Sequence, residues 1–86
     1  MQTRSVMAMG VLLNFYEGGP GDSLPWHSHD EDHLTVVVRG RATVANRESS
    51  ISLTPEDDPV IFRAGSEHML AIEEPNTTFI NIFTQK

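Results

Sequence analysis

The chain has 86 residues, which is typical of one domain with a single modest hydrophobic core. Six basic and twelve acidic residues give a formal net charge of −6, so the chain lacks the basic stripe that nucleic-acid binding needs, and anionic membrane surfaces are disfavoured. It contains no cysteine, which excludes disulfides, thiolate nucleophiles and cysteine-ligated metal centres. We expect a cytoplasmic protein, because a small domain without disulfides fits that compartment.

Short apolar runs separated by Gly, Pro, Asn and Asp predict strands along the whole chain, and no segment has the period of a helix. The first run alternates with one parity, so we expect Met7 and Met9 in the core. Two β-branched runs flank Arg39–Arg41, which predicts two strands joined by a tight turn. We expect about seven or eight short strands. The segments concerned are 6–15, 34–40, 41–46, 49–53, 60–65, 68–74 and 77–83.

This series of short strands predicts an all-β sandwich or barrel in one domain, residues 1–86. No repeat, low-complexity tract or linker divides the chain. Edge strands of so small a β domain invite association. We therefore expect a homodimer that uses the apolar N-terminal strand or an outer sheet face. No apolar run approaches the length of a membrane span.

The four histidines of the chain are unevenly distributed. His27, His29 and His33 lie close together, and His68 lies far along the chain. If the first segment is extended, residues two and four apart share one face. Imidazole nitrogens so placed can converge on an ion about 2.0–2.1 Å from each. The alternative is a polar loop rich in histidine, since single histidines are more often surface residues than ligands.

The spacing of these histidines resembles the first motif of the cupin family. That motif places an HxH pair and a glutamate between two glycines. From Gly21 to Gly40 this chain reads G-x5-H-S-H-x3-H-x6-G, which matches the family spacing throughout. The departure is His33, which stands where the family has its glutamate.

A looser match to the second cupin motif lies between Asp57 and Ile72. Gly65 and His68 keep their register in that motif. Asp57, Arg63 and Ile72 stand where the family has a glycine, a proline and an asparagine. The resemblance therefore covers most of the chain, and its first motif is the more specific.

The resemblance implies a small single-domain cupin fold, a double-stranded β-helix or jelly-roll barrel. Carried over position by position, it implies an all-histidine metal site of His27, His29, His33 and His68. Four neutral imidazoles leave the charge of a divalent ion uncompensated, so such a site should attract small anionic or oxygen-chelating ligands. Carboxylates, enolates and catecholates are examples. The spacing does not choose between Fe, Ni, Zn, Mn and Cu.

The function implied is that of a metal-dependent enzyme acting on a small oxygen-rich molecule, and dioxygenase-like oxidative cleavage is the specific hypothesis. Two alternatives stay open. One is a non-catalytic metal-binding, small-ligand-binding or sensor module, and the other is a metal-free fold with vestigial histidines. Fold alone does not choose between them.

Several residues near the histidines have two open interpretations. The acids Asp30, Glu31 and Asp32 could orient ligating rings, or form a solvated loop. Trp26 could guard the mouth of the site or cap the barrel. Residues that share parity with the ligands could line the cavity or belong to the core; they are Thr35, Val37, Leu70 and Ile72. No general base can be named.

Overall fold

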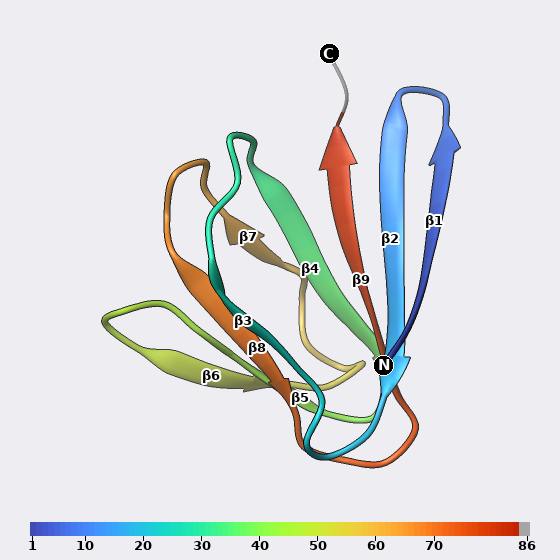
Figure 1. Ribbon diagram of the computed structural model, residues 1–86, viewed down its shortest axis with the longest axis vertical. Helices are drawn as coiled ribbons and strands as arrows, with labels where there is room; N and C mark the ends of the chain where they lie inside the picture. Colours follow the sequence, from blue (N-terminus) through green and yellow to red (C-terminus); the bar gives the residue numbers. More distant parts are fainter. Residues whose placement is uncertain (85–86) are drawn as a thin grey trace.

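The computed structural model describes residues 1–84 of the chain, and these form nine strands without a helix. The strands are β1 (Gln2–Ala8), β2 (Val11–Gly18), β3 (Ser23–His27), β4 (His33–Arg39), β5 (Ala42–Ala45), β6 (Ser50–Leu53), β7 (Val60–Phe62), β8 (His68–Ile72) and β9 (Thr77–Thr84). A five-stranded sheet has the order β1-β2-β9-β4-β7, and a four-stranded sheet has the order β3-β8-β5-β6. Figure 1 shows the two sheets facing one another. The prediction of an all-β jelly roll is confirmed. No described helix is long and apolar enough to cross a membrane.

The N-terminal segment is a hairpin, and the prediction of one strand over 6–15 is wrong. β1 and β2 pair antiparallel, and Met9 and Gly10 connect them with φ angles of 52° and 77°. Positive φ at both central residues is the geometry of a type I′ turn, which a glycine at the second position favours. The turn places Met9 at the tip, where it is 101% exposed, and Met7 is 59% exposed on the edge strand. Neither methionine is in the core.

The predicted turn at Arg39–Arg41 exists, but it does not make a hairpin. β4 pairs with β9 and β7 in one sheet, whereas β5 pairs with β8 and β6 in the other. The turn therefore crosses the sandwich at Gly40, whose φ is 80°. Thr77 fills the space beside it, and its Oγ1 accepts a hydrogen bond of 3.2 Å from the Arg41 amide. This close approach leaves no room for a side chain at Gly40.

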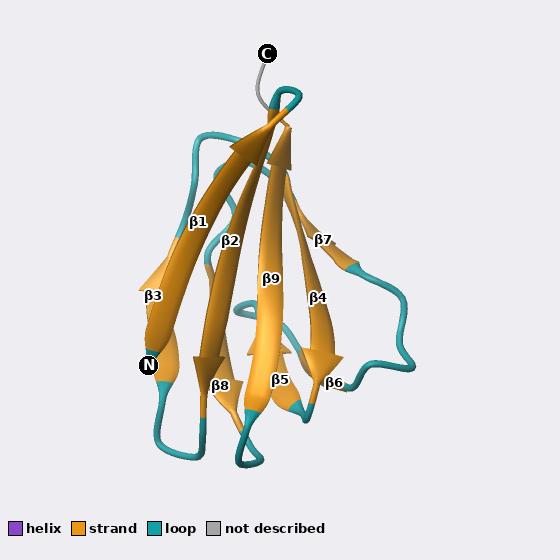
Figure 2. Cartoon of the chain, turned by 90° about the vertical axis from the view of Figure 1, so that its right-hand side faces the viewer, coloured by secondary structure: helices purple, strands orange, loops and turns teal. Residues whose placement is uncertain are grey.

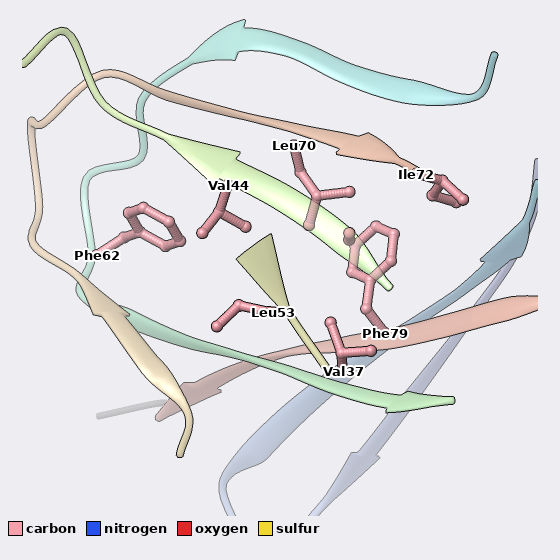
Figure 3. Packing of buried hydrophobic residues seen from close by; sticks show 8 residues of the cluster. Val37, Val44, Leu53, Phe62, Leu70, Ile72 and Phe79 are labelled. Carbon is pink, nitrogen blue, oxygen red and sulfur yellow. The ribbon is translucent and has the colours of Figure 1, made fainter. Parts of the chain in front are cut away.

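The core lies between the sheets and draws on strands of both (Figure 3). Its buried members are Val37, Ala42, Val44, Leu53, Phe62, Leu70, Ile72 and Phe79. In β8 and β9, buried residues alternate with half-buried or exposed ones, which is the pattern of strands with one face on a core. Val37, Leu70 and Ile72, whose role the sequence left open, are thus core residues.

Candidate metal centre

Four histidines from three strands and one loop meet at one end of the sandwich. His27 ends β3 and His68 begins β8, and the two residues pair directly across these strands. His33 begins β4 in the opposite sheet, and His29 lies in the loop that crosses between the sheets (Figure 1). The segment from 27 to 33 is therefore not one extended strand, and a shared strand face does not explain the convergence. The histidines converge because the chain crosses from one sheet to the other between His27 and His33.

The imidazole rings are in mutual contact. The ring of His27 lies 4.4 Å from that of His68 and 4.8 Å from that of His29, measured between centroids. The ring of His33 lies 4.9 Å from His29 and 5.0 Å from His68. All four residues that the sequence singled out are thus brought together.

Two loops are joined so that His29 is held against His68. The amide of Gly65 donates a hydrogen bond of 2.8 Å to the carbonyl oxygen of His29. The carboxylate of Asp32 accepts one of 2.7 Å from the Ala64 amide and one of 3.3 Å from Arg63 Nη1. Asp32 therefore positions the loop, a role that its place in an acidic run did not reveal. Arg63 contributes to this junction at the position of the missing proline.

The protonation of two ring nitrogens follows from their backbone partners. Nδ1 of His27 lies 2.5 Å from the Pro25 carbonyl oxygen, and Nδ1 of His68 lies 3.1 Å from the Ser66 carbonyl oxygen. A carbonyl oxygen can only accept, so Nδ1 carries the proton and Nε2 keeps its lone pair. This arrangement is typical of histidines that bind metal through Nε2.

Three buried ring nitrogens have no hydrogen-bond partner among the described residues. They are Nε2 of His29, Nε2 of His68 and Nδ1 of His33. Burying a polar atom without a partner costs free energy. A metal ion would satisfy such atoms, so the residues present fit a metal ion.

His27, His29 and His68 form the tightest group, because their ligand nitrogens all lie within 4.8 Å of one another. An ion bound about 2.1 Å from each nitrogen would hold any two of them no more than about 4.2 Å apart. Small side-chain movements therefore suffice to close this triad on an ion. His33 lies beside the triad, and its role as a fourth ligand stays a prediction.

The architecture around this centre is known from solved structures. No protein-family model and no curated protein matches the sequence. A cupin superfamily protein from Desulfitobacterium hafniense DCB-2 superposes with a TM-score of 0.82 at 20% identity, over 99% of this chain and 79% of that one. KdgF from Halomonas sp. superposes with a TM-score of 0.87 at 21% identity, over 99% of this chain and 80% of that one. The chain has a cupin fold.

A further cupin-fold structure supports the same conclusion. The cupin-2 domain protein from Shewanella frigidimarina NCIMB 400 superposes with a TM-score of 0.77 at 21% identity, over 99% of this chain and 80% of that one. At these identities the likeness concerns the fold. The chemistry of the site must therefore be argued from its own residues.

Burial favours the neutral imidazole at three positions of this cupin fold, His29, His33 and His68. Burial, followed by the neighbouring His29, His68 and His27, lowers the pKa of His33 to about 4. Burial also lowers the pKa of His29 and of His68. Neutral imidazoles hold free lone pairs at neutral pH, which is the state that binds a metal ion.

Two aromatic rings form the apolar wall of the site. Phe62 stacks on His68 with centroids 4.3 Å apart, and Phe83 stacks on His33 at 4.8 Å. Phe83 also meets the ring of His29 edge-on at 5.2 Å. These contacts hold three of the histidine rings against apolar surface. Neither phenylalanine is distinguished in the sequence from other apolar strand residues.

Trp26 is 39% exposed and contacts an arginine. The guanidinium of Arg47 lies 3.9 Å from the centre of its ring, which is a cation–π contact. Arg47 also forms an ion pair of 3.3 Å with Glu67. Both Trp26 and Glu67 are exposed, so their side chains lie outside the core.

Proposed function

We propose that this protein is a metal-dependent enzyme that acts on a small oxygen-rich molecule, and that it catalyses a dioxygenase-like oxidative cleavage. The observation that carries the proposal is the set of three buried, unpartnered ring nitrogens on His29, His33 and His68. Together with the triad that could hold an ion, these nitrogens supply lone pairs for a metal ion. They supply no negative charge to balance the charge of that ion. The absence of cysteine is our reason for placing this activity in the cytoplasm.

A transition-metal ion held by His27, His29 and His68, with His33 as the proposed fourth ligand, would supply Lewis-acid polarisation of an oxygen ligand and a route for electrons to dioxygen. The chain's own residues do the rest. The carbonyl groups of Pro25 and Ser66 fix the tautomers of His27 and His68. The rings of Phe62 and Phe83 hold the rings of His68 and His33 against apolar surface.

The charge of the site indicates the substrate class. Neutral imidazoles leave a divalent ion with its full charge, so an anionic or chelating oxygen group would be the preferred partner. β-Diketones, catechols and flavonols share this chemistry. Oxidative cleavage of a carbon–carbon bond would consume one molecule of O₂ for each molecule of substrate, with both oxygen atoms ending in the carbonyl or carboxyl products.

The test is oxygen consumption by protein loaded separately with Fe(II), Ni(II), Cu(II), Mn(II) or Zn(II). We expect uptake of one O₂ per substrate cleaved with at least one redox-active metal, and none after the substitution His68→Ala. Mass spectrometry after ¹⁸O₂ labelling checks that both atoms enter the products. If the same substrates perturb the spectrum of bound metal but no oxygen is consumed, the protein is a binding module and the proposed enzyme activity is wrong.

A further inference from the structure

A row of four polar side chains crosses the inner face of the five-stranded sheet. Ser5, Asn14, Asn81 and Thr35 are register partners on β1, β2, β9 and β4. Figure 2 shows these four strands side by side, with the strands of the other sheet behind them. Residues directly opposite on neighbouring strands point to the same face, and their Cβ atoms lie about 4.5–5.5 Å apart. We call these four residues the polar row.

The polar row leads from the solvent into the interior of the sandwich. Ser5 is exposed, Asn14 is half-buried, and Asn81 is 4% exposed. The inward neighbours of Asn14 on β2, Leu12 and Tyr16, are half-buried as well. The four-stranded sheet therefore leaves this flank of the inner face partly uncovered, and a small molecule can reach Asn14 from there.

Both carboxamides of the polar row have their oxygens occupied and their nitrogens free. Ser5 Oγ donates a hydrogen bond of 2.7 Å to Asn14 Oδ1, and Thr35 Oγ1 donates one of 2.7 Å to Asn81 Oδ1. Within residues 1–84, no hydrogen bond involves Nδ2 of Asn14 or Nδ2 of Asn81. Nδ2 of Asn81 is also not among the fully enclosed atoms of these residues that lack a partner, so it borders space that a ligand atom can reach.

The free nitrogens make the polar row a site for an oxygen anion. Each carboxamide nitrogen carries two N–H donors, and a buried donor without an acceptor costs free energy. No acidic side chain lies on the inner face of β2 and β9 to compete for these donors; the residues there are Leu12, Asn14, Tyr16, Gly18, Thr77, Phe79, Asn81 and Phe83. A carboxylate offers two oxygens and can accept hydrogen bonds from both amides at once, and its charge strengthens them.

The polar row lies directly beside the histidine cluster. On β4, His33 precedes Thr35 by two residues, and on β9, Phe83 follows Asn81 by two residues. His33 and Phe83 are themselves register partners, so the two rows are neighbours on one face of the sheet. Two residues along a strand cover about 6.6 Å. A molecule of about that length spans from the histidines to the carboxamides.

We infer that Asn14 and Asn81 bind a carboxylate of the ligand whose other end meets the ion held by the histidines. The inference rests on the proposed function for the metal-binding end, whereas the carboxylate end rests on the polar row alone. It narrows the substrate class to small molecules with an oxygen-chelating group at one end and a carboxylate at the other. Ser5 and Thr35 are positioning residues, because they hold the amide oxygens and leave the N–H donors to the ligand.

The carboxylate end is tested first on metal-free protein, which makes the result independent of the proposed activity. The probe is benzoate, and benzamide is its neutral counterpart. We expect the side-chain NH₂ signals of Asn14 and Asn81 in ¹⁵N–¹H NMR spectra to shift saturably with benzoate and not with benzamide. Signals of both residues that stay in place at millimolar benzoate would overturn the inference.

The substitution Asn14→Asp separates the role of the donors from the stability of the fold. The new carboxylate still accepts the hydrogen bond from Ser5, but it offers no N–H donor and repels benzoate. We expect the affinity for benzoate to fall about tenfold or more. The matched control is Asn46→Asp, since Asn46 Oδ1 also acts as an acceptor, of hydrogen bonds of 2.8 Å from the amides of Glu48 and Ser49. Equal losses in the two variants would mean that net charge alone weakens binding, which contradicts the inference.

A second pair of probes tests whether the two ends of the ligand bind together. The protein is loaded with Zn(II), which has no redox chemistry, so the probes bind without being turned over. We expect 3,4-dihydroxybenzoate to bind about tenfold or more tightly than catechol in calorimetry, and Asn14→Asp to remove this preference. Equal affinities of the two probes for the wild-type protein would overturn the inference. A preserved preference without oxygen uptake by protein loaded with a redox-active metal would contradict the proposed cleavage and support the carboxylate site.

Discussion

Thr35 donates a hydrogen bond of 2.7 Å from its Oγ1 to Oδ1 of Asn81 across strands β4 and β9. Both side chains are buried, at 1% and 4% exposure. On β4, Thr35 stands between His33 and the core residue Val37 on the inward face, so this polar pair separates the histidine cluster from the apolar core. Asn14 pairs with Asn81 on the next strand and accepts a hydrogen bond of 2.7 Å from Ser5.

The substitution Thr35→Val should lower the free energy of unfolding by about 1–3 kcal/mol, because it leaves the carboxamide oxygen of Asn81 buried without its donor. Urea denaturation measures the change. Ser5→Ala removes a hydrogen bond of equal length at an exposed position and should cost about 0.5 kcal/mol or less. If both variants lost the same free energy of unfolding, burial would not determine the cost of removing the hydrogen bond.

Replacing Gly40 with alanine should destabilise the protein by several times the effect of the same change at Gly65. Both glycines have positive φ, 80° and 81°, so both substitutions carry a backbone cost of about 1–2 kcal/mol. At Gly40 the new Cβ would also lie 2.8 Å from the Cα of Thr77, whereas nothing lies within 4 Å at Gly65. Thermal unfolding of the two variants checks the difference. A similar loss at both sites would mean that the turn adjusts without strain.

The metal content of variants should distinguish the histidine ligands from the neighbouring acidic residues, which do not bind the ion. We expect protein purified without added metal to retain about one ion per chain, and His68→Ala to lose it, because the tightest group of ring nitrogens would then have two members. The control Glu31→Gln removes a charge beside His29 but no ring nitrogen, and should keep the ion. Elemental analysis measures both. Full metal occupancy in His68→Ala would contradict the centre described here.

Asp32 should affect metal affinity without touching the ion. Asp32→Ala removes the hydrogen bonds to the Ala64 amide and to Arg63, so the loop that carries His29 keeps the backbone bond from Gly65 but loses its side-chain attachment. Loss of such an orienting contact typically weakens metal affinity about 10- to 100-fold. Competition with a chelator measures this, and Asp30→Asn is the matched control. If the two variants bind metal equally, Asp32 does not position His29.

The metal-free protein should lose stability as the solution becomes mildly acidic. Burial lowers the pKa of His33 from 6.5 to about 4 in the folded state. Between these values the unfolded chain binds more protons than the folded one, so the free energy of unfolding rises with pH in this window and levels off above about pH 6.5. Each extra proton bound by the unfolded chain makes the free energy of unfolding rise by up to about 1.4 kcal/mol per pH unit.

Urea denaturation of metal-free protein across this range measures that slope. In His33→Gln one titrating group is removed, so the slope between about pH 4 and about pH 6.5 should decrease. An unchanged slope in His33→Gln would mean that His33 does not contribute to it. His29 and His68, whose pKa values are also lowered, account for the part that remains.

Strand content and the four histidines could be predicted from the sequence, because both depend on local patterns. Alternating apolar residues and turn residues indicated strands, and the spacing from Gly21 to Gly40 singled out His27, His29 and His33. Strand pairing could not be predicted in the same way. Whether the runs on either side of Gly40 form a hairpin depends on Thr77, which is distant in sequence and fills the space beside that turn.

The sequence by itself determined the all-β class, since side-chain period is a local property, and its resemblance to the cupin motifs named the four histidines as candidate ligands. Only the tertiary structure decided how those residues meet. His33 reaches the others because the chain crosses between sheets, and Asp32 and Gly65 hold the crossing loop in place. The structure also revealed that Val6, Leu13, Ile82, Leu34 and Ile61 form one row. That row depends on the register of five strands, which no single segment of the chain encodes.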